Sequence, residues 1–510
     1  MTLRPQDKPA LDWLGRWSTY APNKAALIDG DSGKELSYLK FFQHASTCAA
    51  KLQKDFQIGF GDRVAAVCTN ELEYVVLFYA LQRIGAILVP VNFRFTEKEI
   101  DYVLGNCGAK LVVTQASFAE KIETVRKNNT QHEFQTILLQ KLIDLEKNDH
   151  VSFAFTSQAQ QDTPTMILYT SGTTGFPKGA ILHHDMLFWN AVNTSLRLNI
   201  SQNDCAVIFL PLFHTGGWNV LMTPFFHRGA TIVLTKKFDA DQVLQLSESH
   251  HCSLLFGVPT TMDMMARSAR FATCNLQSLR YAVVGGEPMP VELIRTWAEK
   301  GVAVRQGYGL TEFGPNVFSL NEEDAIRKIG SIGFPNFYIE IKIMNQDQEA
   351  APNEVGELWL KGPMCMLGYW NNPKATAETI VQDGWLKTGD LVRRDEDGYV
   401  YVVGRMKEMY ISGGENVYPA EVEKVLRSLP IVREAAVIGV EDSKWGEVGK
   451  AFVTLEETTS KMDQEAIKVQ ILDYCMAHLA KFKIPKYIQF LDSLPKGESG
   501  KILKKDLKSL

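Results

Sequence analysis

The sequence predicts an α/β protein with parallel sheets, followed by a β-rich segment and a small α+β domain. Three observations support this fold class. Helical patterns alternate with short β-branched runs in the first half, short strands and turns follow after about residue 330, and another αβ segment begins near residue 404. Strands that alternate with helices form parallel sheets covered on both faces, which gives αβα layers.

The strands of the first half are expected in runs of β-branched and small apolar residues. These runs are Arg63–Cys68, Ala86–Val91, Ala109–Thr114, Ala230–Thr235 and Tyr281–Gly286. The later strands are expected in YIEIKIM at 338–344, GELWLKG at 356–362 and DGYVYVVG at 397–404. No internal period of roughly 20–50 residues is visible, so a repeat architecture is not expected.

Composition and charge indicate an ordinary globular protein of two or three domains. The net charge of −5 over 510 residues gives no reason to expect nucleic acid as a partner. The 8 cysteines are scattered without a CxxC pair, which favours reduced thiols and a cytoplasmic location. The pairs His183-His184 and His250-His251 lack the spacing of a helical metal site.

Neither end of the chain suggests export or a membrane span. The start, MTLRPQDKPA, has no apolar core of a secretory signal, and the end, KSL, differs from the peroxisomal SKL. The most apolar stretch, Tyr74 to Phe93, contains Gln82, Arg83, Gly85 and Pro90. We therefore expect a buried helix followed by a strand there.

A loop rich in small residues, YTSGTTGFPKGA from Tyr169 to Ala180, follows the apolar run TMIL. Glycines permit close backbone approach, hydroxyls can donate hydrogen bonds, and Lys178 supplies one positive charge. The small residues between Thr170 and Lys178 are Ser171, Gly172, Thr173, Thr174 and Gly175. The loop is not a Walker motif, because Gly179 follows the lysine. It predicts a phosphate site; a solvated turn between a strand and a helix is the alternative.

Further motifs follow this loop in a fixed order. PLFHTGG spans 211–217, GGEPMP 285–290, QGYGLTE 306–312 and WLKTGDL 385–391; GELWLKGP begins at Gly356, GRMKEMYISGGENVYPAEVE at Gly404, and LPKGESGKILKKDL ends at Leu507. With the loop, this series resembles the adenylate-forming superfamily of acyl- and aryl-CoA synthetases, luciferases and adenylation domains of peptide synthetases. The resemblance covers essentially the whole chain and is most similar to bacterial fatty-acyl-CoA ligases.

The resemblance implies two half-reactions and two domains. A carboxylate attacks the α-phosphate of ATP to give an acyl-adenylate and pyrophosphate, and the thiol of coenzyme A then displaces AMP. The large N-terminal domain would span 1–404, with a small β-barrel-like subdomain, and the small mobile C-terminal domain would span 405–510. The hinge of its rotation would be Lys407.

The same resemblance implies a set of nucleotide contacts. The loop from Thr170 to Lys178 would hold the β- and γ-phosphates, Tyr308 would stack on adenine, Thr311 would bond the α-phosphate, and Glu312 would bind Mg²⁺, a cation that prefers oxygen ligands. Further contacts would come from Gly286, Glu287, Pro288, Gln306, Gly307, Gly309 and Val402.

Three charged residues of the C-terminal third complete the implied adenylation site. Asp390 would accept the ribose hydroxyls, or else serve as a simple turn residue. Arg405 would add a contact to ribose or phosphate. Lys501, directly after Gly500, would bridge the substrate carboxylate and the α-phosphate.

The coenzyme A site would lie on the C-terminal domain. Ser412, Gly413, Gly414 and Glu415 would line the pantetheine tunnel, and Trp445 and Lys486 would contact the coenzyme. Some related ligases carry a basic residue two positions after the phenylalanine at 482, whereas this chain has Ile484. That departure weakens a detailed transfer of the coenzyme contacts.

The acyl pocket is implied at His214, Thr215, Trp218, Gly285 and Gly309. Peptide-synthetase domains usually place Asp where this chain has His214, so an α-amino acid would lose the partner of its ammonium. Trp218 either gates a fatty-acyl tunnel or belongs to the core. We expect a medium- or long-chain fatty acid, with cinnamate- or benzoate-type acids as the alternative.

Other functions are also consistent with the resemblance. A carrier-protein-loading acyl-AMP ligase would dispense with free coenzyme A, and a luciferase-like oxygenase would emit light with a luciferin. A non-catalytic nucleotide-binding protein has no chemical reason to keep Lys178, Glu312, Asp390, Arg405 and Lys501 together. A homodimer and a peripheral contact with a membrane are both left open.

Overall fold

The computed structural model describes residues 11–128, 132–147, 151–156, 158–170, 177–456, 463–497 and 502–510. These residues form two compact units, the first from 1–340 and 360–386 and the second from 341–359 and 387–510. The predicted fold class is confirmed, since a large α/β part precedes a smaller C-terminal part. The boundary expected between 404 and 405 falls inside the second unit of this division and stays a prediction.

The first sheet of the first unit has the strand order β6-β5-β3-β4-β7-β8. Its strands are β3 (Arg63–Val67), β4 (Ile87–Pro90), β5 (Leu111–Thr114), β6 (Gln135–Leu138), β7 (Pro164–Thr170) and β8 (Lys178–His183). The expected strands at 63–68, 86–91 and 109–114 are thus confirmed, and they pair in parallel. Only β7 and β8 pair antiparallel, as a hairpin.

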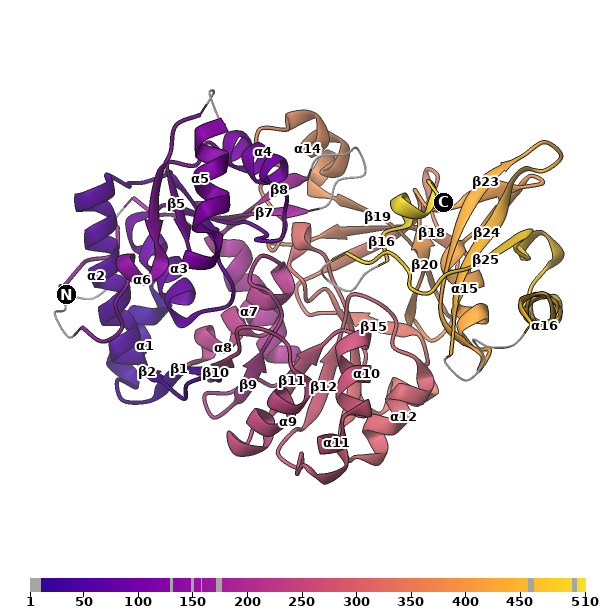
Figure 1. Ribbon diagram of the computed structural model, residues 1–510, viewed down its shortest axis with the longest axis horizontal. Helices are drawn as coiled ribbons and strands as arrows, with labels where there is room; N and C mark the ends of the chain where they lie inside the picture. The colour runs from indigo at the N-terminus through magenta and orange to yellow at the C-terminus, as the bar shows by residue number, and fades with distance from the viewer. Residues whose placement is uncertain are drawn as a thin grey trace. The chain divides into compact units, whose positions relative to one another are not determined.

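Helices alternate with strands along this part of the chain (Figure 1). They are α1 (Trp13–Tyr20), α2 (Tyr38–Phe56), α3 (Leu72–Ile84), α4 (Glu97–Cys107), α5 (Ala119–Asn128), α6 (Leu139–Leu142) and α7 (His184–Arg197), with the 3₁₀ turn η1 (Ala116–Phe118). The start of α4 is fixed by a capping box in which Thr96 and Glu99 exchange hydrogen bonds.

Helix α3 is buried on nearly every face, and β4 follows it. This confirms the prediction for the stretch from Tyr74 to Phe93. Buried inside it, Arg83 forms an ion pair of 2.9 Å with Asp12. Among the helices that the structure describes, none combines the length and apolarity that a membrane crossing requires.

The second sheet of the first unit runs β15-β14-β13-β12-β11-β9-β10-β1-β2. Its strands are β1 (Ala25–Asp29), β2 (Glu35–Ser37), β9 (Cys205–Ile208), β10 (Thr231–Leu234), β11 (Leu254–Gly257), β12 (Tyr281–Val284), β13 (Ala303–Tyr308), β14 (Phe318–Ser319) and β15 (Ser331–Pro335). The expected strands at 230–235 and 281–286 are confirmed as members of its parallel part.

This second sheet is built from units in which a helix follows a strand (Figure 1). The helices in this part of the chain are α8 (Met222–Arg228), α9 (Ala240–Ser249), α10 (Pro259–Arg267), α11 (Ala269–Thr273), α12 (Val291–Glu299) and α13 (Asp324–Arg327); shorter turns are η2 (Gly216–Val220), η3 (Thr311–Phe313) and η4 (Gln382–Gly384). The helix α14 (Pro373–Thr379) instead follows a segment that pairs with β8 of the first sheet. The apolar faces of α9, α10, α11 and α12 meet the strands in a core that includes Val207, Leu255, Met262 and Trp297.

The second unit is rich in strands, as the texture after residue 330 predicts. One set runs β17-β16-β18-β19-β20, and another runs β22-β21-β24-β23 with β25 beside β24. The strands are β16 (Glu340–Asn345), β17 (Gln348–Glu349), β18 (Val355–Lys361), β19 (Leu386–Arg394), β20 (Val400–Arg405), β21 (Tyr410–Ser412), β22 (Glu415–Val417), β23 (Val432–Asp442), β24 (Gly446–Leu455) and β25 (Tyr487–Phe490). The helical elements are α15 (Pro419–Arg427), α16 (Gln464–His478), α17 (Lys504–Leu507) and η5 (Lys481–Lys483).

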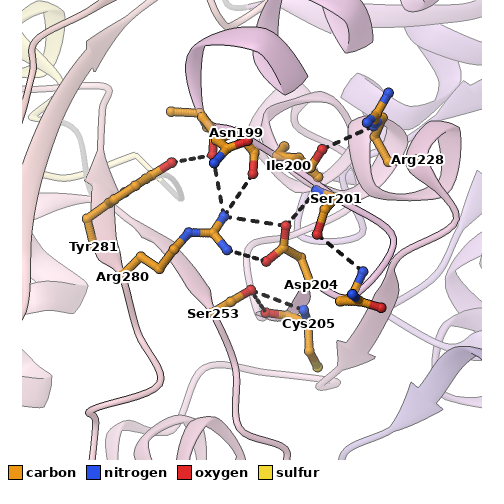
Figure 2. A network of polar contacts seen from close by, with 11 residues as sticks. Asn199, Ile200, Ser201, Asp204, Cys205, Arg228, Ser253, Arg280 and Tyr281 are labelled. Carbon is orange, nitrogen blue, oxygen red and sulfur yellow. Dashed lines mark hydrogen bonds and ion pairs between the residues drawn. The ribbon is translucent and has the colours of Figure 1, made fainter.

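A polar network ties the loop before β9 to the strands beside it (Figure 2). The buried carboxylate of Asp204 accepts hydrogen bonds from Arg280 at 2.6 Å and from the backbone N–H of Ser201 at 2.6 Å. Burial alone would raise the pKa of Asp204, but hydrogen bonds from Arg280, Ser253 and Ser201 outweigh burial and hold it below its ordinary value.

We predict that Asp204→Asn weakens the protection of β9 and β12 from hydrogen exchange by about 2 kcal/mol at pH 7, since it removes hydrogen bonds to a charged group. The depressed pKa makes the contribution of Asp204 fully present above the unfolded-state value of about 3.9, and it is lost as the pH falls through the folded-state value. The difference between wild type and variant should therefore shrink below about pH 4.

Glu292→Gln provides a matched control, because it breaks an ion pair with Arg295 in which the glutamate side chain is 83% exposed. Its effect should stay below about 0.5 kcal/mol. Equal protection of the two strands in wild type and Asp204→Asn at pH 7 would contradict the role given to the network.

Candidate active site

The predicted phosphate loop connects two antiparallel strands. Thr170, the last residue of β7, is paired across the hairpin with Lys178, the first residue of β8. The two residues that begin and end the proposed cradle therefore lie opposite each other, and the element that follows the loop is the strand β8, whereas the alternative considered from the sequence expects a helix there. Ser171, Gly172, Thr173, Thr174 and Gly175 lie outside the described residues.

A second motif meets this hairpin at Glu312, in the short turn η3. The carboxylate oxygen Oε1 of Glu312 accepts hydrogen bonds from the hydroxyl of Tyr369 at 2.9 Å and from that of Thr170 at 3.4 Å. The ammonium of Lys178 lies 5.2 Å from the centre of the Tyr369 ring. One anion, one cation and two hydroxyls thus gather at the end of the hairpin.

The chemistry of these groups fits a hard divalent cation held together with a phosphate ligand. Mg²⁺ in nucleotide sites is usually bound by one or two carboxylates and by substrate phosphates. Glu312 offers such a carboxylate, with Thr170 as an oxygen neighbour. Among the described residues, no group of three His, Cys, Asp or Glu side chains is arranged to hold a metal ion.

The motifs at 285–290 and 306–312 meet on adjacent strands. Val284 at the end of β12 pairs with Gln306 of β13, and the Gln306 side chain donates a hydrogen bond of 3.3 Å to the carbonyl of Glu287. Gly286 has a φ of +85°, which favours glycine. A Cβ on Gly309 would lie 2.1 Å from the carbonyl oxygen of Pro315, so this position also requires glycine.

The other predicted nucleotide contacts of the first unit lie on the same strands and turns. Gly307 and Tyr308 of β13 pair with β14, and the Tyr308 ring packs at 5.8 Å on Phe318. Thr311 begins the η3 turn beside Glu312, and Pro288 is exposed in the turn that follows β12. The structure thus brings together the motifs that carry the expected adenine and phosphate contacts.

The loop that carries His214 is held by Asn70, a residue that the sequence did not single out. The buried amide of Asn70 accepts a hydrogen bond from the N–H of Leu212 and donates to the carbonyls of Leu210 and Thr235. Burial, assisted by the charge of Arg94, lowers the pKa of His214 to about 4. The imidazole is therefore neutral at pH 7.

Three of the predicted acyl residues, His214, Thr215 and Gly285, lie in two glycine turns with Phe256 between them. A Cβ on Gly216 would lie 3.5 Å from the Phe256 ring, and one on Gly285 would lie 3.6 Å from it. Thr215 accepts a hydrogen bond from Asn219 at 3.2 Å. Phe256, at the end of β11, therefore separates the turn that carries His214 from the turn at Gly285.

Trp218 is fully buried. Its ring packs on Tyr74 and Phe78, with centroid distances of 5.6 and 4.9 Å, and its indole N–H donates to the carbonyl of Leu212. These contacts make it a core residue beneath the loop of His214 in this structure.

In the second unit, Asp390 and Arg405 face each other on neighbouring strands. They are register partners of β19 and β20, and their side chains form an ion pair of 2.9 Å. Asp390 is buried, whereas the Arg405 side chain is 50% exposed. Val402 lies on the same strand as Arg405 and pairs with Val392.

The expected coenzyme residues gather around the hairpin of β21 and β22. Gly413 and Gly414 form its turn with φ values of +60° and +89°, while Ser412 and Glu415 pair across it. The N–H of Gly413 donates to the carbonyl of Trp445 at 2.8 Å. Beside Trp445 is an open groove of about 830 Å³ lined by Ile411, Glu441, Asp442, Ser443, Gly446 and Glu447.

The remaining predicted residues of the second unit are lysines. Lys486 forms an ion pair with Asp442, one of the acidic residues of this groove. Lys407 lies in the turn after β20, and Lys501 lies outside the described residues. Lys504 binds Glu408 at 2.7 Å and Glu423 at 2.8 Å, which ties the C-terminal segment to the residue after Lys407.

Known families and relatives match the chain over almost its whole length. The AMP-binding enzyme family matches residues 14–370, and the C-terminal domain of AMP-binding enzymes matches residues 421–501. A feruloyl-CoA synthase of an Amycolatopsis species is 36% identical over 97% of this chain and 98% of its own. The long-chain-fatty-acid–CoA ligase FadD13 of Mycobacterium tuberculosis is 34% identical over 97% of each chain.

A solved structure agrees with these relatives. The o-succinylbenzoate coenzyme A synthetase MenE of Bacillus subtilis, in complex with ATP and a magnesium ion, has a TM-score of 0.86 and 33% identity and covers 98% of this chain and 99% of its own. The chain therefore belongs to the AMP-binding enzyme family, the adenylate-forming superfamily that its motifs indicate, and within it to the acyl- and aryl-CoA ligases.

Proposed function

We propose that the protein is an ATP-dependent CoA ligase that joins a carboxylic acid with an uncharged body to coenzyme A. The carboxylate attacks the α-phosphate of ATP, pyrophosphate leaves, and the thiol of coenzyme A then displaces AMP to give the thioester. The observation that carries this proposal is the group formed by Thr170, Lys178, Glu312 and Tyr369, which suits the phosphates of a metal-bound nucleotide.

The first half-reaction brings two anions together, so the site must supply positive charge and fixed orientation. Lys178 would neutralise part of the triphosphate charge, and Lys501 would bridge the attacking carboxylate and the α-phosphate. Glu312, with Thr170 beside it, would hold Mg²⁺, which supplies charge neutralisation at the leaving pyrophosphate when bound.

A buried neutral imidazole suits the place beside the acyl carboxylate. Because its pKa is about 4, His214 adds no positive charge there at pH 7 but keeps a ring nitrogen for hydrogen bonding. The same turn offers no carboxylate for a substrate ammonium, which supports an acid without an α-amino group.

Two classes of acid are candidates. A medium- or long-chain fatty acid is the expectation from the motifs, and FadD13 among the relatives is named for such substrates. An aryl acid is supported by the name of the feruloyl-CoA synthase. It is also supported by Trp218, because an indole that packs in the core on Tyr74 and Phe78 is not placed as the gate of a fatty-acyl tunnel. We carry both classes into the first experiment.

The second unit would bind ribose and coenzyme A. Asp390 would accept hydrogen bonds from the ribose hydroxyls beside its ion pair with Arg405. Gly413 and Gly414 leave room for a narrow pantetheine chain, and Trp445 and Lys486 would contact the coenzyme. Between the half-reactions, rotation about Lys407 would move Lys501 away from the site and bring this coenzyme-binding surface to it.

The first experiment measures AMP release from ATP and Mg²⁺ with octanoate, palmitate, benzoate, coumarate and ferulate, each with and without coenzyme A. We expect turnover that depends on coenzyme A with one class of acid, and that class names the substrate. Formation of the acyl-adenylate with no AMP released when coenzyme A is added would replace this proposal by a carrier-protein-loading ligase.

The Lys501→Ala variant should lower adenylation by roughly 100- to 1,000-fold, since it removes a charge that stabilises the transition state. Release of AMP from preformed acyl-AMP by coenzyme A should change little. Lys508→Ala, at an exposed position near the chain end, is the control. Equal losses in both steps would refute the assigned role.

Lys407→Pro should impair one half-reaction far more than the other, because proline fixes φ near −65° and would hold the hinge in one orientation. Lys407→Ala controls for loss of the side chain and should leave both steps close to wild type. If the proline variant loses both steps in parallel, rotation about this residue is excluded.

A further inference from the structure

Tyr369 occupies a central position that none of the sequence motifs indicates. Its hydroxyl donates a hydrogen bond to Glu312, and its ring lies beneath the ammonium of Lys178. One side chain thus contacts both the carboxylate expected to bind Mg²⁺ and the lysine expected to bind the triphosphate.

We propose that Tyr369 is a positioning residue of the adenylation step, which orients Glu312 for Mg²⁺ and supports Lys178 beneath the phosphates. This inference rests on the proposed function. In this proposal the hydroxyl of Tyr369 orients Glu312, and its ring supports the ammonium of Lys178.

The hydroxyl fixes which carboxylate oxygen is available. Among the described residues, Glu312 accepts hydroxyl hydrogen bonds from Tyr369 at 2.9 Å and from Thr170 at 3.4 Å, and both reach Oε1. A donor held at one oxygen restricts rotation of the carboxylate and leaves Oε2 for a cation. Partners that orient a metal ligand in this way commonly affect metal affinity or activity by about 10- to 100-fold when they are removed.

Backbone pairing holds Tyr369 itself in place. The segment from Leu367 to Trp370 pairs with β8 through N–H bonds from Leu367 to the carbonyl of Ile181 at 3.1 Å and from Trp370 to that of Gly179 at 2.7 Å. The N–H of Tyr369 also donates a hydrogen bond to the hydroxyl of Thr376 at 2.9 Å. Tyr369 is therefore fixed relative to the strand that begins at Lys178.

The same segment is tied to Glu312 from the other side. The N–H of Met366 donates to the backbone carbonyl of Glu312 at 2.9 Å. The next residue but one, Gly368, has a φ of +140°, and a Cβ there would lie 2.7 Å from Thr376. The backbone thus sets the distance between Glu312 and Lys178, and Tyr369 fills the space between them.

The experiment compares Tyr369→Phe, which removes only the hydroxyl, with Tyr369→Leu, which also removes the ring. Mn²⁺ replaces Mg²⁺, and its binding to the protein with a non-hydrolysable ATP analogue is followed by electron paramagnetic resonance. In parallel, the Mg²⁺ and ATP dependence of adenylation is measured with the acid identified above.

We expect Tyr369→Phe to weaken Mn²⁺ binding by about 10- to 100-fold and to raise the Mg²⁺ concentration for half-maximal adenylation by a similar factor. Its KM for ATP at saturating Mg²⁺ should stay near that of wild type, because the ring under Lys178 is kept. Tyr369→Leu should show the same metal effect and also a raised KM for ATP.

Tyr401→Phe is the matched control, since it removes another tyrosine hydroxyl that donates to a carboxylate, that of Asp395, at 3.2 Å. Tyr401 is not one of the predicted nucleotide contacts, and its ring, which the variant keeps, lies 4.4 Å from the guanidinium of Arg393. This variant should retain wild-type affinity for Mn²⁺ and for ATP, and melting temperatures check that all variants are folded.

The outcomes separate the inference from the proposed function. If wild type adenylates an acid and Tyr369→Phe binds Mn²⁺ as wild type does, the positioning role is overturned and the proposed function stands. If wild type neither binds the metal with the nucleotide analogue nor adenylates any acid, both fail. Equal changes in Mn²⁺ affinity for Tyr369→Phe and Tyr401→Phe would also overturn it, because the effect would not be specific to Glu312.

Discussion

The candidate site depends on backbone pairing along β8. On one side β8 pairs with β7, which places Thr170 opposite Lys178. On the other it accepts the segment from Leu367 to Trp370, nearly two hundred residues later in the chain, as an added edge. A shift of either pairing by one residue would turn the side chains to the opposite face, so register decides whether Lys178, Tyr369 and Glu312 meet.

Much of this arrangement could be predicted, because it follows from local patterns. The β-branched runs between helices correctly predicted β3, β4, β5, β10 and β12 and their parallel pairing. The motifs named Thr170, Lys178 and Glu312 as neighbours of one nucleotide, and the structure places these three together. Charged and glycine-rich positions can be recognised in the sequence, because few other residues supply the same charge or the same backbone freedom.

What could not be predicted depends on contacts between distant segments. Tyr369 carries no charge and no distinctive spacing, and only the register of its segment on β8 gives it a role. Asn70 could not be identified from the sequence for the same reason, because its amide acts by donating hydrogen bonds to the distant backbone carbonyls of Leu210 and Thr235. In the proposed acyl pocket, the identity of the acid would depend on packing around Phe256, because Gly216 and Gly285 contribute no side chain there.

The predicted ligand contacts already have partners inside the protein, and those partners differ in strength. Lys178 lies over the ring of Tyr369, a weak contact that a triphosphate can complement. Lys486 is paired with the carboxylate of Asp442, so a coenzyme phosphate would have to replace a charged partner in an acidic groove. Such exchange gains less than adding a new ion pair, because one charge–charge interaction is lost for each one formed. In the proposed reaction the nucleotide is needed first and coenzyme A second. In that reaction Lys178 could add the triphosphate to its ring contact in the first step, whereas Lys486 would have to exchange Asp442 for the coenzyme in the second.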